Sequence, residues 1–81
     1  MTLPALTEVP LVDIVAGDAV WSPDDRCFYF VDSAVRVGQR LTLVYAGGIA
    51  VPFDLDQVRR ILRAEDPDAA EIFNLEKGWA A

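Results

Sequence analysis

Three aromatic side chains, Trp21, Tyr29 and Tyr45, are the residues of this chain best suited to recognise another molecule. They lie in two apolar segments that are bounded by turn residues at 22–25 and at 47–48. Aromatic rings supply large contact areas, and their faces attract cations. If both segments are strands of one small sheet, the three rings either fill its core and rim or line a single opening that binds a partner.

Three acidic residues, Asp18, Asp24 and Asp25, stand close to these aromatics in the sequence. We expect them to rim the same opening, where their charge would steer a partner with a basic surface. A metal site is not predicted at Asp24 and Asp25, because calcium-type sites need several oxygen ligands at set spacings. The two residues are interpreted as turn residues.

The chain lacks the residues that most catalytic sites require. It has no histidine and a single cysteine, Cys27. Ser22 and Ser33 therefore have no histidine to act as a base, and a zinc site cannot be assembled. The Gly47–Gly48 pair lacks the Lys and Ser/Thr of a phosphate-binding loop. We predict no enzymatic activity, no metal and no cofactor, with Cys27 as a small buried hydrophobic residue in a reducing compartment.

The composition describes one small acidic domain over residues 1–81. The chain is 53% hydrophobic and carries a formal net charge of −6. An acidic surface repels phosphate backbones and anionic lipid, so we expect a protein partner with a basic surface, no direct nucleic-acid binding and no membrane binding. No signal peptide or membrane span is seen, which predicts a cytoplasmic location. A domain this small would gain stability from a partner or from homo-oligomer formation.

Residues 11–53 are expected to form a sheet of short antiparallel strands, after an extended arm over residues 1–10. The clearest strands cover residues 19–21, 27–37, 41–45 and 49–53. Gly47–Gly48 predicts a tight type I′ hairpin with positive φ at both positions. Pro52 cannot donate a hydrogen bond to a neighbouring strand, so it predicts a sheet edge.

Residues 54–81 are expected to form one or two short helices. Asp54 is a candidate N-cap for the first helix, in which Leu55, Val58, Ile61 and Leu62 would share one face. Asp66 and Pro67 are typical of a second helix start, and Lys77–Gly78 of its end. The predicted fold is thus α+β, a small antiparallel SH3-like barrel or bent sheet of four to five strands followed by these helices.

The helical segments add two further candidate surfaces. Arg59, Arg60 and Arg63 would form a basic stripe on the first helix. The stripe could anchor an acidic partner or a phosphate, but we favour a solvated face partly paired with Asp56 and Glu65. A second surface, for docking into a larger complex, would consist of Ile72, Phe73 and Trp79.

The segment 17–58 resembles a Tudor domain, one of the SH3-like small β-barrels. The resemblance is carried by Gly17-Asp18, Val20-Trp21-Ser22, Cys27-Phe28-Tyr29, Val44-Tyr45-Ala46-Gly47 and Phe53-Asp54-Leu55. Tudor domains of this type bind methylated arginine or lysine in an aromatic cage. The resemblance implies that Trp21, Tyr29 and Tyr45 would be walls of such a cage, although no fourth aromatic stands at Gly48.

The sequence therefore predicts a protein that acts by stoichiometric protein binding through an aromatic, acid-rimmed surface. Three alternatives stay open. The protein could be an inhibitor of host machinery, such as a nuclease or CRISPR complex, that imitates nucleic-acid phosphates with its acids. The composition, rich in Ala, Val, Asp and Arg with one Lys, is typical of the bacterial or phage sources of such inhibitors. It could also be a methyl-arginine or methyl-lysine reader with a degraded cage, or a non-catalytic subunit of a larger complex.

Overall fold

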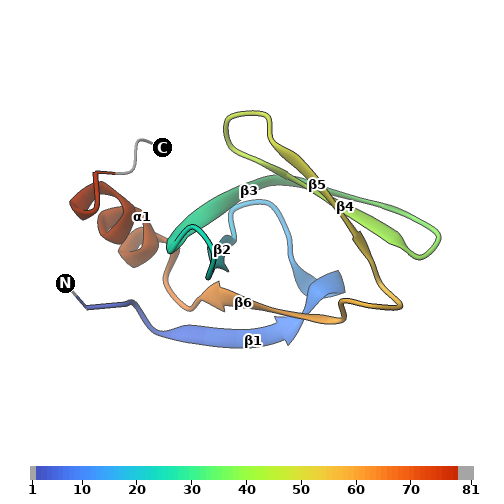
Figure 1. Cartoon of the computed structure of the whole chain (residues 1–81), viewed down its shortest axis with the longest axis horizontal. Coiled ribbons are helices and arrows are strands. Elements are labelled where there is room, and N and C mark those ends of the chain that lie inside the picture. The colour runs from blue at the N-terminus through green and yellow to red at the C-terminus, as the bar shows by residue number, and fades with distance from the viewer. Residues whose placement is uncertain (1, 79–81) are drawn as a thin grey trace.

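One antiparallel sheet and one helix make up the part of the chain, residues 2–78, that this computed structural model describes (Figure 1). The six strands are β1 (Leu6–Pro10), β2 (Ala19–Ser22), β3 (Cys27–Val37), β4 (Arg40–Tyr45), β5 (Ala50–Asp54) and β6 (Arg60–Ala64). A 3-10 turn (Leu11–Asp13) follows β1, and the helix α1 covers Pro67–Glu76. The α+β prediction is confirmed.

The strands follow the order β1-β6-β2-β3-β4-β5, so β1 and β5 are the two edges of the sheet. The sheet is open, because these edges do not pair with each other. It is nevertheless bent: Val9 of β1 and Leu55, which follows β5, belong to the same buried cluster. The bent sheet of the prediction therefore describes this fold and a closed barrel does not, and the predicted four to five strands are too few, because the sheet has six.

The predicted extended arm over residues 1–10 is wrong for its second half, which forms β1. This strand pairs antiparallel with β6. The backbone N–H of Leu11 continues the ladder by donating to the carbonyl of Arg59 at 2.8 Å. Pro10 is compatible with the strand, because it ends the element at a sheet edge, where a missing N–H costs little.

The predicted first helix, over residues 54–65, is also wrong. Asp54 caps a turn instead: its carbonyl accepts from the backbone N–H groups of Gln57 (2.9 Å) and Val58 (2.8 Å). The chain then extends into β6. Asp54 thus starts a single turn, as a helix N-cap would, but no helix follows that turn.

Pairing on both sides explains why β6 is a strand. Ile61 lies opposite Val9 of β1, and Arg63 lies opposite Val20 of β2. A segment that joins two strands satisfies its backbone through ladder hydrogen bonds, and this outweighs a weak local helix preference. Ile61 is half-buried on the side of Val9, whereas Leu62 points to the other side and is more exposed.

The two faces of the sheet carry separate clusters of buried side chains. The inner face, on the concave side, holds Val9, Leu11, Ile14, Val20, Val31, Leu41, Leu43, Tyr45 and Leu55. The helix face, covered by α1, holds Ala19, Phe28, Ala64, Ala70 and Phe73. Alternation along each strand separates the two sets.

The helix α1 begins and docks through two polar contacts. The Asp66 carboxylate accepts from the backbone N–H of Asp68 at 3.0 Å, with Pro67 in the first turn, as predicted. The buried Asn74 side chain makes two hydrogen bonds with the backbone of Phe28, at 2.9 Å to its N–H and 2.8 Å to its carbonyl. β4 does not reach Phe28, so on that side of β3 the Asn74 side chain makes the hydrogen bonds that a neighbouring strand would make.

The predicted β4–β5 hairpin and sheet edge are confirmed. Gly47 and Gly48 both have positive φ, at 95° and 85°. The predicted type I′ turn is wrong in length, because that turn has a two-residue loop. Here the N–H of Tyr45 donates to the carbonyl of Ile49, so the loop consists of three residues, 46–48. Pro52 lies on β5, the edge strand.

Candidate functional site

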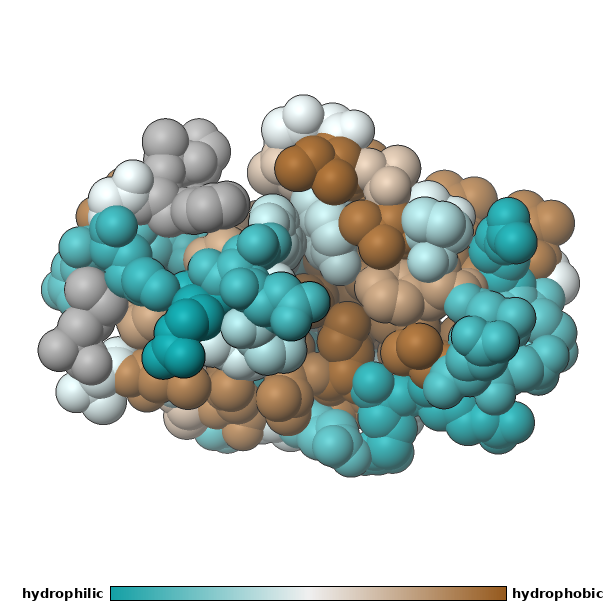
Figure 2. Space-filling view, viewed as in Figure 1, coloured by the Kyte–Doolittle hydropathy of each residue, from teal (hydrophilic) through white to brown (hydrophobic). Residues whose placement is uncertain are grey.

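A groove of about 440 Å³ opens on the inner face of the sheet. Its walls come from β2, β3, β4, β5 and β6 and from the turn that joins β2 to β3. The lining residues are Val20, Trp21, Ser22, Pro23, Asp24, Asp25, Tyr29, Tyr45, Ile49, Val51, Phe53, Val58 and Ile61. Figure 2 shows a hollow on this side of the molecule with hydrophobic side chains inside it. The groove exists because the sheet bends without closing.

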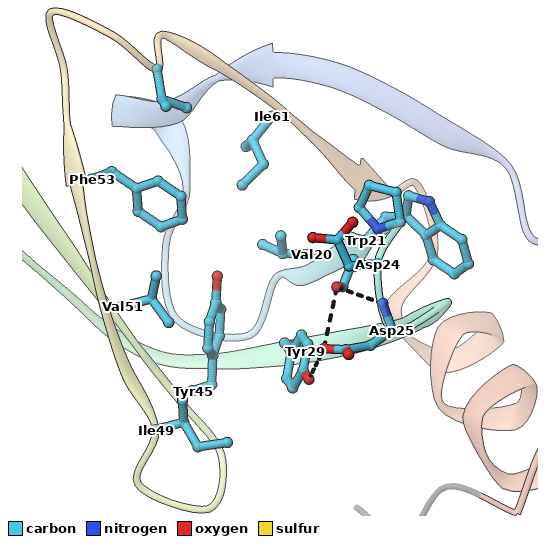
Figure 3. Close-up of a pocket in the computed structure, with 13 residues that line it drawn as sticks. Val20, Trp21, Asp24, Asp25, Tyr29, Tyr45, Ile49, Val51, Phe53 and Ile61 are labelled. Carbon is cyan, nitrogen blue, oxygen red and sulfur yellow. Dashed lines mark hydrogen bonds between the residues drawn. The ribbon is translucent and has the colours of Figure 1, made fainter.

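Two of the three predicted aromatics meet in this groove. The rings of Tyr29 and Tyr45 lie 5.2 Å apart, with an angle of 31° between their planes. Tyr45 is 5% exposed, and burial raises the pKa of its hydroxyl. Figure 3 shows its ring projecting into the groove beside Val51 and Phe53. The Tyr45 hydroxyl makes no hydrogen bond to any described residue, so it is available to a ligand.

The Tyr29 hydroxyl is held by the turn between β2 and β3. It donates a hydrogen bond to the carboxylate of Asp25 (Figure 3). The backbone N–H of Asp25 in turn donates to Ser22 Oγ at 3.3 Å. The hydrogen bond to Asp25, followed by burial, raises the pKa of Tyr29. Of the two turn carboxylates, Asp25 is therefore engaged, whereas Asp24 is exposed and has no polar partner within residues 2–78.

Trp21 borders the groove, but its ring belongs to the helix face. The indole lies 5.0 Å from the ring of Phe28 and 5.9 Å from that of Phe73. Strand pairing explains this placement: Trp21 lies opposite Phe28, whereas Val20 lies opposite Tyr29. The structure thus brings together Tyr29 and Tyr45 and leaves Trp21 outside a common cage.

Asp18 does not rim the groove. Its carboxylate accepts from the backbone N–H of Val15 at 2.9 Å and from Arg63 Nη1 at 3.1 Å. It lines a separate depression that also includes Arg63 and Thr7. Asp18 therefore fastens the turn before β2 to strand β6.

The predicted basic stripe is divided between different surroundings. Arg60 bonds to Glu8 of the neighbouring strand at 2.6 Å, and Arg63 bonds to Asp18. Arg59 is exposed. The expected pairing of these arginines with Asp56 and Glu65 is wrong, because it assumed helical spacing in a segment that is extended.

The predicted docking surface at the C-terminal end is also divided. Ile72 is exposed on α1, whereas Phe73 is buried in the cluster on the helix face. Trp79 lies outside the described residues. Cys27 is buried, as expected, and burial raises the pKa of its thiol.

Several groove residues were not singled out from the sequence. Ile49, Val51 and Phe53 alternate along β5, and this pattern did indicate one apolar face. Val58 and Ile61 were assigned to a helix, which hid their position across the groove. Their place across from β5 depends on the pairing of β6 with β1 and β2, which local sequence patterns do not reveal.

No cluster of metal-binding side chains and no helix of membrane-spanning length occurs within residues 2–78. The polar groups that line the groove are two phenolic side chains, the Ser22 hydroxyl and the carboxylates of Asp24 and Asp25, and the rest of the lining is apolar. These groups can bind a ligand through apolar contact and hydrogen bonds.

The fold and the groove define this chain as a small α+β domain with a grooved antiparallel sheet. No protein-family model, curated protein or solved structure matches it.

The raised pKa values of Tyr29 and Cys27 predict a loss of stability in alkali. In the unfolded chain these groups ionise near their ordinary pKa values, 10.0 and 9.0. Their contribution to stability is fully present below those values and is lost as the pH rises through the higher values of the folded state. We expect the free energy of unfolding, measured with urea, to fall above about pH 9. Tyr29→Phe should flatten this fall, and an unchanged slope would contradict the assignment.

Proposed function

We propose that this protein is a non-enzymatic binding module whose groove accepts a segment of a partner protein. The segment would place an apolar side chain in the groove and a basic residue beside Asp24. The volume of the groove lies within the range of roughly 300–1,000 Å³ that is usual for sites that bind small ligands. Binding would be stoichiometric.

The observation that carries this proposal is a pair of uncommitted polar groups in an apolar groove. The Tyr45 hydroxyl lies in the groove, and the Asp24 carboxylate lies at its rim, and neither has a hydrogen-bond partner among residues 2–78. A few polar groups within an apolar lining are typical of recognition sites, because they fix the orientation of what binds. Asp24 would attract a lysine or arginine of the partner.

Exposed aliphatic side chains in the groove support the same proposal. Ile49 is 50% exposed and Val58 is 36% exposed. Covering such surface stabilises a complex by about 25 cal/mol for each Å² of apolar area removed from water. Both side chains would be available to a partner without rearrangement of the sheet.

A methylated side chain is not the ligand that we favour. A Tudor-like or SH3-like module would need its aromatic rings on one side, and here the Trp21 indole packs against Phe28 and Phe73 instead. Tyr29 and Tyr45 alone form a weaker cage for a cation. The groove is better suited to an apolar side chain with an unmodified basic neighbour.

Peptide selection against the full chain tests the proposal. We expect selected peptides from a random displayed library to combine an apolar or aromatic residue with lysine or arginine. Ile49→Asp should weaken their binding by about tenfold or more, because it places a charge in the groove. Leu75→Asp, the same kind of change at an exposed position on α1, should leave affinity within about twofold. Titration calorimetry gives both values.

The charge contribution is tested separately with Asp24→Asn. We expect a loss of affinity of about threefold to tenfold that shrinks at high salt, since Asp24 is exposed and its charge is screened. Peptides that bind equally well to wild type and Ile49→Asp would overturn the groove as the site. Binding that depends on salt but not on Ile49 would instead favour acidic mimicry of nucleic acid.

A further inference from the structure

A second pocket lies on the helix face, between the turn that joins β2 to β3 and the C-terminal end of α1. Figure 1 shows this turn beside the helix. The pocket has a volume of about 340 Å³, and the described residues that line it are Leu3, Trp21, Arg26, Phe73 and Lys77. Two aromatic rings, an aliphatic side chain and two cations therefore meet here, and none of these described lining residues is acidic.

The Lys77 ammonium is held at the wall of this pocket. Its Nζ donates a hydrogen bond of 2.7 Å to the carbonyl of Arg26 and lies 5.6 Å from the centre of the Phe73 ring. An ammonium group has three N–H donors, and this is the one hydrogen bond that it makes within residues 2–78. The other two donors are available to an anion in the pocket.

Arg26 supplies the second cation at a conformational cost. Its φ of 54° lies in the left-handed region, which favours glycine, and every other described residue with positive φ is a glycine. The Arg26 guanidinium makes no hydrogen bond or ion pair within residues 2–78. No contact in the described fold thus requires an arginine here, and strained residues of this kind often belong to binding sites.

The acidic residues next to the two cations face other surroundings. Asp25, which precedes Arg26, accepts a hydrogen bond from the Tyr29 hydroxyl. Glu76, which precedes Lys77, lines a neighbouring depression along α1. The pocket is therefore locally basic, on a chain whose formal net charge is −6.

We infer that this pocket binds an acidic segment of a partner protein, in which an apolar side chain stands next to an aspartate or glutamate. The apolar side chain would lie among Leu3, Trp21 and Phe73. The carboxylate would accept charge-assisted hydrogen bonds from Arg26 and Lys77. A nucleic acid also carries anions, but the net negative charge of this chain repels its many phosphates.

This ligand differs from that of the groove. The groove would take a basic residue beside Asp24, whereas the second pocket requires an acidic one. Trp21 borders both sites, but the two cations belong only to the second. The inference therefore does not depend on the proposed function.

Peptide selection with the full chain carrying Ile49→Asp tests the inference, because this change blocks the groove and leaves the second pocket intact. We expect the peptides selected from a random displayed library to combine aspartate or glutamate with a large apolar residue. Titration calorimetry should give them the same affinity for wild type within about twofold. Selection that yields no peptide, or only peptides without acidic residues, would overturn the inference.

Arg26→Gly separates binding from a structural role. Glycine is favoured at positive φ, so this variant should unfold at a urea concentration equal to or above that of wild type. Its affinity for the selected peptides should nevertheless fall about tenfold or more. Arg59→Gly removes the same side chain at an exposed position outside the pocket and should keep affinity within about twofold. The inference fails if Arg26→Gly binds like wild type, or if it unfolds at a lower urea concentration.

Leu3→Asp tests the apolar contact and the sign of the charge together. Leu3 is 42% exposed, and the new carboxylate would compete with the ligand for the two cations. We expect affinity for the selected peptides to fall about tenfold or more. Val12→Asp, a matched change at a residue that is 50% exposed and outside the pocket, should keep affinity within about twofold. Equal losses in the two variants would show a general charge effect and overturn the assignment to this pocket.

Discussion

Replacing Asn74 with leucine is expected to lower the free energy of unfolding by about 3–5 kcal/mol. The side chain of Asn74 is 2% exposed and satisfies both backbone groups of Phe28. Leucine has a similar size but no polar atoms, so the N–H and the carbonyl of Phe28 would both stay buried without partners. Each such group costs about 1–3 kcal/mol.

The position of Asn74 increases this effect. It lies next to Phe73, whose ring packs edge-on against Phe28 at 5.6 Å. Loss of the two hydrogen bonds would therefore loosen the aromatic contacts between α1 and β3 as well. Urea denaturation of dilute samples measures the change. Glu71→Leu, at an exposed position of the same helix, should change stability by less than about 0.5 kcal/mol.

An Asn74→Leu protein that unfolds at the same urea concentration as wild type would contradict this account. It would show that the helix is held by apolar contacts alone. A partial loss, of about 1 kcal/mol, would indicate that water reaches the Phe28 backbone and replaces the amide.

The helix and the hairpins could be predicted because their signals are local. Asp66 and Pro67 mark the start of α1 through chemistry within one turn. Gly47 and Gly48 provide the positive φ values that the β4–β5 connection requires. These residues restrict the backbone whatever the rest of the chain does.

The strand β6 could not be predicted, because its structure depends on distant partners. Leu55, Val58 and Ile61 have a helical spacing that the folded protein does not use. What decides the outcome is the space between β1 and β2, which an extended segment fills. The missed strand also concealed one wall of the groove, since Ile61 lines it.

The position of Trp21 depends on the exact register of the β2–β3 hairpin. Ser22 lies opposite Cys27, so four residues form the connection and Trp21 falls opposite Phe28. A shift of one residue would have placed Trp21 opposite Tyr29 and on the inner face. Arg26, at a φ of 54°, is the residue of that connection that adopts the left-handed region. The sequence identified the aromatic residues, but it did not determine the face on which each ring lies.

The two faces of the sheet differ in how completely they are covered. The helix face is covered by α1, whereas the inner face is covered only in part, by Leu11 and Ile14 among others, and is partly open as the groove. An open groove can persist only if the residues beneath it are packed well enough to hold the sheet in its bent shape. We therefore expect a large loss of stability when Leu43, the most buried side chain of β4, is truncated.

Leu43→Ala is expected to lower the free energy of unfolding by about 3–5 kcal/mol. Leu43 is 0% exposed in the cluster of the inner face, and it lies opposite Val51, which lines the groove. Truncation removes buried apolar surface and leaves a cavity that paired strands on either side of β4 cannot easily collapse to fill. Val12→Ala, at a half-exposed position, should cost less than about 1 kcal/mol.

Urea denaturation at low protein concentration measures both variants. A loss below about 1.5 kcal/mol for Leu43→Ala would mean that the inner face relaxes around the missing side chain. The bend of the sheet would then be adjustable, and the shape of the groove would follow its ligand. A loss in the expected range would instead indicate a rigid wall, because a core that cannot shrink around a cavity also holds Val51 in place for whatever binds there.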